Sequence, residues 1–125
     1  MLSSSDIFAA LNVSAITSLL DYKTGTTPAM WADSIPQSFT KNKSINFYLT
    51  DRIEGGLEYT LQRWTVNCRA ATKAEAEAIG TAVFNEINRK SYTDYYLLCS
   101  ILPVIFPADD TDNYNCVIEV TLKKK

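Results

Sequence analysis

The strongest structural signal in the sequence is a helix over residues 73–89 that directly follows a long strand. Thr72 and Glu75 have the T-x-x-E spacing of a capping box, in which two side chains satisfy amides left open at the start of a helix. The apolar residues that recur at helical spacing are Ala76, Ile79, Gly80, Val83, Phe84 and Ile87. This apolar face predicts that the helix packs against a sheet formed by the neighbouring segments.

Two strands are predicted before this helix. Apolar and polar residues alternate over 45–50, which is the period of a half-buried strand. A longer strand is predicted over 57–70, where the apolar side changes between Leu61 and Trp64. That change indicates a bulge, or a strand whose two ends are covered differently. Trp64 lies in the strand interior, so we expect it in the core.

Two further strands are predicted after the helix. The first covers 96–106, and Pro103 places its second half at an edge or a bend, because proline has no amide for the sheet ladder. The second covers 115–123 and follows an acidic turn at 109–113. Its inward-facing residues are predicted to be Cys116, Ile118, Val120 and Leu122.

An N-terminal helix is predicted over residues 5–21. Ser4, Ser5 or Asp6 can cap its start, because short polar side chains accept hydrogen bonds from the first amides of a helix. The Val13-Ser14 step interrupts the pattern, so two short helical turns are an alternative.

We therefore predict an α+β fold in a single domain of residues 1–125. The order helix–strand–strand–helix–strand–strand (α-β-β-α-β-β) predicts a mostly antiparallel β-sheet of about four strands, with two helices packed on it. Residues 22–44 contain turn-forming glycine and proline, which predicts a long irregular loop. The lysines at 123–125 predict a disordered basic tail.

Composition argues against most catalytic chemistry. The chain has no histidine, which is the commonest general base and metal ligand, and it has no glycine-rich phosphate loop. Its three cysteines lack the C-x-x-C spacing of zinc and redox sites, so we expect reduced and mostly buried thiols. We predict that the chain is not an enzyme and that it binds no cofactor and no metal.

The net charge and hydropathy of the sequence limit which partners we expect the protein to bind. A formal net charge of −2 gives no electrostatic case for nucleic-acid binding. The N-terminus lacks the basic and apolar regions of a signal peptide, and no apolar run has the length of a membrane span. We expect a protein made in a cytoplasm that has no membrane partner.

The candidate interaction residues come from two loops and a tyrosine-rich stretch: Trp31, Lys41, Lys43, Tyr92, Tyr95, Asp109, Asp110 and Asp112. Aromatic side chains anchor interfaces because they bury a large area at a low entropic cost, although Trp31 and the tyrosines also fit packing within the domain. The acidic turn is interpreted as a solvated hairpin tip, with a weak calcium or magnesium site as the alternative.

The order of these features resembles the tail-completion, or tail-terminator, proteins of long-tailed bacteriophages. The resemblance extends from about Asp6 to Leu122 and depends on order, length and local composition. The segments that carry it are Ile7-Phe8-Ala9-Ala10-Leu11, Ile35-Pro36-Gln37-Ser38, Ile45-Asn46-Phe47-Tyr48-Leu49, Trp64-Thr65-Val66-Asn67-Cys68-Arg69-Ala70 and Thr72-Lys73-Ala74-Glu75-Ala76-Glu77.

The resemblance implies a structural virion protein with no active site. Such a subunit forms a ring, commonly a hexamer, at the head-proximal end of the tail, where it ends tail-tube growth and joins the tail to the head connector. The implied partners are other copies of the chain, the tail-tube protein and the head–tail connector protein, with genomic DNA passing through the lumen. An exposed strand edge, such as the one with Pro103, is expected to add to a neighbour's sheet.

Other functions remain open on the sequence. A head–tail connector or a tail-tube subunit has a similar size and also assembles into rings. A non-viral ligand-binding or regulatory α+β module is a further alternative. An enzyme that uses aspartate and tyrosine without histidine is the least favoured.

Overall fold

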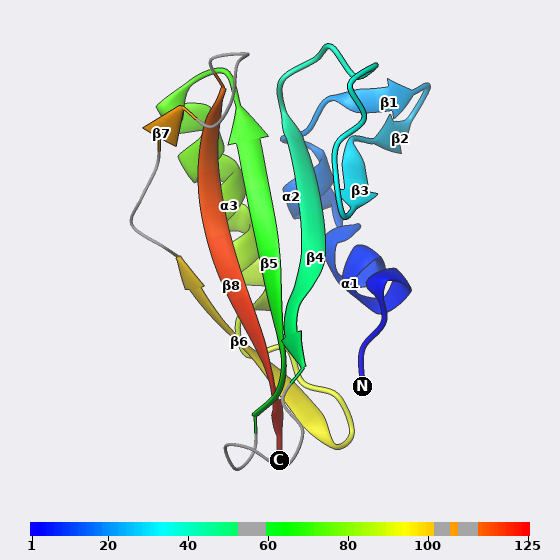
Figure 1. The fold of residues 1–125 in the computed structure, drawn as a ribbon, viewed down its shortest axis with the longest axis vertical. Helices are drawn as coiled ribbons and strands as arrows, with labels where there is room; N and C mark the ends of the chain where they lie inside the picture. Colours follow the sequence, from blue (N-terminus) through cyan, green and yellow to red (C-terminus); the bar gives the residue numbers. More distant parts are fainter. Residues whose placement is uncertain (53–59, 102–105, 108–112) are drawn as a thin grey trace.

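The computed structural model describes residues 1–52, 60–101, 106–107 and 113–125. The chain forms an α+β fold, as predicted (Figure 1). Its elements in chain order are α1 (Ser4–Leu11), α2 (Ser14–Thr17), β1 (Tyr22–Thr24), β2 (Thr27–Pro28), β3 (Met30–Ala32), β4 (Ser44–Arg52), β5 (Thr60–Ala70), α3 (Lys73–Ile87), β6 (Tyr95–Ile101), β7 (Phe106–Pro107) and β8 (Tyr114–Lys124).

The strands form one main sheet and one small hairpin. The main sheet has the order β3-β4-β5-β8-β6, with β7 also paired to β8, and β1 pairs with β2 separately. All of these pairings are antiparallel except that of β3 with β4. The three helices lie behind the sheet in Figure 1, so no helix among the described residues covers the other face of its central strands. The predicted antiparallel sheet is confirmed, and it is wider than expected.

The long strand β5 forms the centre of the core. Every second residue from Thr60 to Ala70 is buried, and this face lies against the apolar face of α3. The predicted change of side between Leu61 and Trp64 is wrong, because buried Gln62 continues the inward series. A register shift between Thr60 and Gln62 does agree with the predicted bulge.

Helix α3 begins as the capping signal predicts. The Thr72 hydroxyl accepts a hydrogen bond from the Glu75 amide at 3.2 Å and donates one to the Glu75 carboxylate at 2.9 Å. Gly80 then allows the helix to approach β8 closely, since a Cβ atom there would lie 2.4 Å from the Cys116 sulfur. This contact sets the spacing between the helix and the sheet.

The N-terminal helix differs from the prediction in two ways. The expected helix over residues 5–21 is two short helices, α1 and α2, as the Val13-Ser14 alternative anticipates. Its cap is Ser3, one residue before the predicted candidates: the Ser3 hydroxyl accepts from the Asp6 amide, and the Asp6 carboxylate accepts from the Ser3 amide at 2.7 Å. The Ser3 amide and hydroxyl both donate to the Asp6 carboxylate, and these two hydrogen bonds lower the pKa of Asp6.

A buried glutamine fastens the N-terminus to the sheet. Gln62 is 1% exposed, and its amide group binds the backbone of Leu2 twice: its oxygen accepts from the Leu2 amide and its nitrogen donates to the Leu2 carbonyl, each at 3.1 Å. The Trp64 indole also donates to the Gln62 oxygen at 3.4 Å. The Gln62 side chain therefore binds the Leu2 backbone in the way that the backbone of a neighbouring strand would.

Two predicted irregular segments are ordered. The expected loop over 22–44 contains β1, β2 and β3, and β3 adds a parallel strand to the sheet edge. The expected disordered tail at 123–125 is also wrong, since Lys123 and Lys124 belong to β8 and the Lys125 amide donates to the Asp94 carbonyl at 2.9 Å. The second half of the predicted strand over 96–106, with Pro103, lies mostly outside the described residues.

The three thiols are reduced and lie in or beside the core. Cys68 and Cys116 are buried and face each other across β5 and β8, while Cys99 is half-buried. Burial raises the pKa of Cys68 and Cys116, and it raises the pKa of Cys99 to about 12. Neutral thiols are therefore the stable form in the folded protein at neutral pH.

We expect the substitution Gly80→Ala to lower the free energy of unfolding by about 1–3 kcal/mol, because the added methyl group overlaps the Cys116 sulfur. The cost of this overlap exceeds the roughly 1 kcal/mol by which alanine, compared with glycine, stabilises an exposed position in a helix. Urea unfolding measures the change.

Two variants control for this result. Thr81→Ala, on the exposed side of the same helix, should change stability by about 0.5 kcal/mol or less. Adding Cys116→Ala to Gly80→Ala should restore part of the loss, because it removes the overlapping atom. A Gly80→Ala protein more stable than the wild type would show that this contact does not limit the packing of α3.

We expect the free energy of unfolding to fall as the pH rises above about 9, the ordinary value for a thiol, towards 12. In this range the unfolded chain loses the Cys99 proton while the folded chain keeps it, so proton release favours unfolding. Urea titrations between pH 8 and 10.5 measure the slope. The Cys99→Ala variant should show a shallower slope than the wild type, and equal slopes would contradict the assignment.

Candidate interaction surfaces

An aromatic hollow lies beside the β3 edge of the sheet. It has a volume of about 280 Å³ and is enclosed by β1, β3 and the segment 36–41. Its lining residues are Tyr22, Lys23, Trp31, Pro36, Ser38, Phe39, Thr40 and Lys41. The Trp31 ring meets the Phe39 ring edge-on at 4.8 Å between centroids, and the Lys23 ammonium lies 4.6 Å from the centre of the Trp31 ring. We call this feature the lysine–tryptophan hollow.

Hydrogen bonds hold the walls of this hollow together. The Asp21 carboxylate accepts from the amides of Asn42 and Lys43, at 3.1 and 2.9 Å. The Asp21 amide donates to the Lys43 carbonyl at 2.9 Å, and the Lys41 ammonium donates to the Tyr22 carbonyl at 3.2 Å. These contacts join the start of β1 to the segment before β4, so the hollow is preformed in the fold.

The hollow carries positive charge on an apolar wall. Burial lowers the pKa of the Lys23 ammonium. Within the described ranges, no carboxylate lies within ion-pair distance of Lys23 or Lys41. A cation that is partly removed from water gains most from an opposite charge brought to it. The hollow is therefore suited to an anionic group with some apolar surface.

The structure joins two of the predicted interface residues and separates the others. Trp31 and Lys41 both line the hollow, but Lys43 lies with Glu75 and Ile79 in a smaller pocket of about 150 Å³ between α3 and the residues that follow α2. The sequence reasoning missed Lys23 and Phe39, the two residues that contact the Trp31 ring. Their spacing from Trp31, eight residues on either side, carries no recognisable pattern in the sequence.

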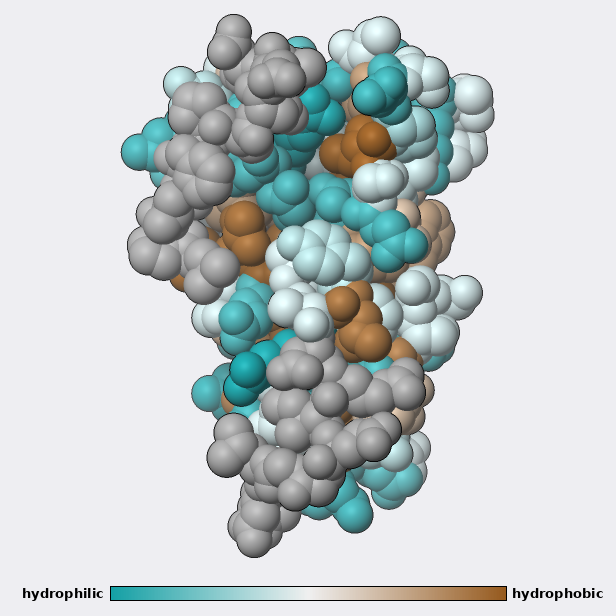
Figure 2. Space-filling model, in the orientation of Figure 1, coloured by the Kyte–Doolittle hydropathy of each residue, from teal (hydrophilic) through white to brown (hydrophobic). Residues whose placement is uncertain are grey.

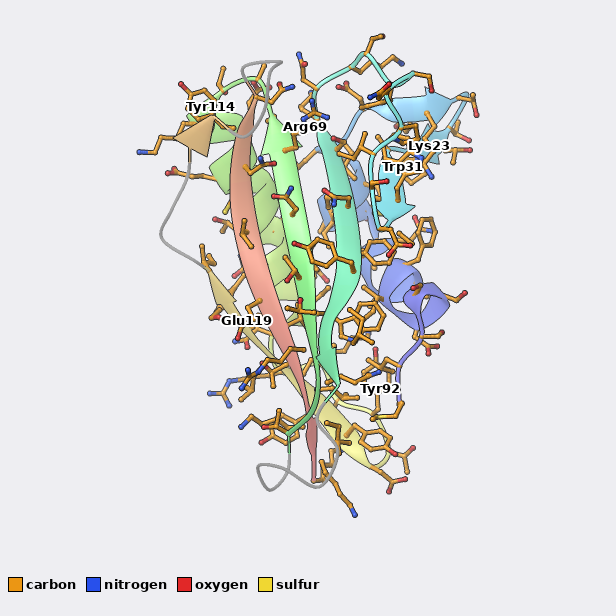
Figure 3. The ribbon with its side chains drawn as sticks, viewed as in Figure 1. Lys23, Trp31, Arg69, Tyr92, Tyr114 and Glu119 are labelled. Carbon is orange, nitrogen blue, oxygen red and sulfur yellow. The ribbon has the colours of Figure 1, made fainter. Side chains whose placement is uncertain are left out.

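The predicted tyrosines lie at the other end of the molecule from Trp31, as the labels in Figure 3 show for Tyr92. Tyr92 and Tyr95 are half-buried against the core, and the Tyr92 amide donates to the Tyr95 carbonyl at 2.7 Å. Burial and the negative charge of Asp6 raise the pKa of Tyr92. Their main contacts are within the domain. The remaining predicted residues, Asp109, Asp110 and Asp112, lie outside the described residues.

The sheet face without helices is mainly polar. Figure 2 shows teal and white residues over its centre, with separate brown spots. Its side chains join neighbouring strands: the Asn67 amide donates to the Asn46 oxygen at 3.2 Å, and the hydroxyls of Thr50 and Thr65 share a short hydrogen bond. Tyr48 lies between these pairs on β4 and is 39% exposed. Tyr48 thus presents an aromatic side chain to solvent on this face.

The outer edge of β6 is largely occupied. The Leu97 amide donates to the Lys90 carbonyl at 2.9 Å, and the Cys99 amide donates to the Asn88 side chain at 2.9 Å. The side-chain oxygen of Asn88 thus accepts the hydrogen bond that a carbonyl of a neighbouring strand would otherwise accept. The prediction that a neighbour adds a strand beside Pro103 concerns a residue outside the described ranges, and the described part of this edge is satisfied internally up to Cys99.

Groups suited to catalysis or metal binding are sparse in the described part of the chain. Those residues contain no group of three or more carboxylate or thiol side chains placed to hold a metal ion. The raised pKa values of the thiols make Cys68, Cys99 and Cys116 poor nucleophiles at neutral pH. None of the described helices is both long enough and apolar enough to span a bilayer.

Comparison with known proteins gives a match of fold. No protein-family model matches the chain, and no curated protein sequence matches it. A chain in the solved structure titled "Virion of native gene transfer agent (GTA) particle" superposes with a TM-score of 0.63 at 12% sequence identity. The match covers 94% of this chain and 90% of that chain. The protein therefore shares its fold, over almost its entire length, with a chain of a gene transfer agent virion.

Proposed function

We propose that this protein is a structural subunit of a phage-type virion that forms a ring at the head-proximal end of the tail. In this role it ends growth of the tail tube and joins the tail to the head connector. Its partners are further copies of itself, six to a ring, together with the tail-tube protein and the head–tail connector protein. It would be assembled in the host cytoplasm and remain in the virion.

The observation that carries this proposal is the match of fold with a virion chain. The match covers nearly all of both chains, so each chain consists of this one fold without large additional segments. The order of elements that resembles tail-terminator proteins covers nearly the same residues. Fold alone does not define a function, so the particular role at the tail end depends on that resemblance.

The surfaces described above also favour assembly over catalysis. The chain has no histidine, and its thiols are stabilised in the neutral form. The exposed features are a preformed aromatic hollow and a polar sheet face with Tyr48, which are suited to contact with other proteins. A net charge of −2 also suits a lumen through which DNA passes without being held.

The two edges of the sheet differ, which favours a ring. One edge is β3 beside the β1–β2 hairpin, and the other is formed by β6 and β7 (Figure 1). When one edge of a subunit contacts the other edge of the next, the contact is head-to-tail. Such contacts close into a ring when the rotation between subunits divides a full turn.

We expect the purified protein to form a closed ring in a concentration-dependent manner, and to cap purified tail tubes from the same virus at one end. Light scattering gives the mass of the assembly, and negative-stain electron microscopy shows the ring and the capped tubes. A tail-tube subunit would instead extend the tubes. A protein that stays monomeric at high concentration, with and without tubes, would contradict the proposal.

A further inference from the structure

The lysine–tryptophan hollow adjoins a second hollow at the same edge of the sheet. The second hollow has a volume of about 260 Å³ and shares Lys23 and Trp31 with the first. Its remaining walls come from β3, from β4 and from the start of α1, which contributes the Phe8 ring. Lys23 and Trp31 lie side by side at this edge in Figure 3. The two hollows together form one groove, which we call the β3 groove.

The β3 groove carries positive charge that no carboxylate of the described residues neutralises. Burial lowers the pKa of Lys23, and no described carboxylate contributes to its shift. The Lys41 ammonium donates to the Tyr22 carbonyl at 3.2 Å, which uses one of its three donors. A carboxylate placed here would offset the desolvation of Lys23 and accept from the remaining donors of Lys41. The occupant of the groove should therefore be acidic.

The aromatic rings of the groove favour a protein segment over a nucleic acid. A base binds by stacking on an open ring face, but the Lys23 ammonium lies over the Trp31 ring, 4.6 Å from its centre. Phe39 packs edge-on against the same ring. The net charge of −2 also disfavours a chain of phosphates. Carboxylates with apolar neighbours are the chemistry of an acidic peptide.

The form of the groove favours an extended segment. An occupant that enters both hollows must be longer than a single side chain. In an extended chain successive side chains point in opposite directions, so every second residue can face the groove. Within the described ranges of this chain, no two acidic residues are neighbours in sequence. The acidic segment is therefore expected on a different protein.

We infer that the β3 groove binds an extended acidic segment of a partner protein. A glutamate or aspartate side chain of this segment pairs with Lys23 and Lys41, and apolar side chains next to it contact Phe8 and Phe39. The inference does not depend on the proposed function, because the groove has this chemistry in a single subunit. It adds to that function a rule for which partner segments the subunit recognises.

The test is binding of two short peptides to the full-length protein, read by tryptophan fluorescence. The acidic probe is a capped peptide of sequence serine–leucine–glutamate–glutamate–leucine–serine, and the neutral probe has glutamine in place of both glutamates. Neither peptide is aromatic, so the emission reports on the protein. We expect the acidic peptide to bind about 10-fold more tightly than the neutral one, because only it forms charge-assisted hydrogen bonds with the two lysines.

Variants locate the binding site. We expect K23Q/K41Q to weaken binding of the acidic peptide by about 10-fold and to leave binding of the neutral peptide unchanged. The matched control is K124Q/K125Q, which removes two exposed lysines at the end of β8 and should bind the acidic peptide like the wild type. Circular dichroism checks the fold. If K23Q/K41Q is unfolded, K23Q alone, which keeps the bond from Lys41 to Tyr22, should weaken binding by about 3-fold or more.

Three results would overturn the inference. The first is equal binding of the two peptides, or no binding of either. The second is acidic-peptide binding that survives in K23Q/K41Q, or that K124Q/K125Q loses to the same extent. The third is tighter binding of a short oligothymidylate than of the acidic peptide, which would make the groove a nucleic-acid site. Ring formation and tail capping are measured separately, so a failure here leaves the proposed function standing, and the reverse also holds.

Discussion

The structure depends on the close contact between α3 and the two central strands of the sheet. Gly80 lets the helix approach until the Cys116 sulfur fills the space where a side chain would be. The buried faces of β5 and β8 are matched to this helix, and the cysteines that face each other beneath it complete the packing. All the described helices lie on one side of the sheet, so none of them covers the other face of its central strands.

The two edges of the sheet, at β6 and at β3, are built in different ways. At β6 the chain satisfies its own amides through Lys90 and Asn88, so strand addition there is already prevented up to Cys99. At β3 the small hairpin and the segment before β4 build a hollow instead.

The sequence was informative about elements with a long regular pattern. The start of α3, the inward residues of β8 and the α+β class follow from capping and periodicity, and they are confirmed. The first elements were harder. Strands of two or three residues, such as β1 and β2, contain too few residues to show a period. Ser3 was passed over as a cap because several neighbouring residues can serve equally well in isolation.

What the sequence determined by itself was therefore local: where α3 begins, which residues of β8 face inward, and that the chain has no histidine for catalysis or metal binding. The tertiary structure alone decided that Gln62 belongs inside, since its partner Leu2 is 60 residues away. It also decided that Lys23, Trp31 and Phe39 share one hollow. Such contacts depend on how β1 and the segment 36–41 pack beside β3, and no local pattern of residues encodes that arrangement.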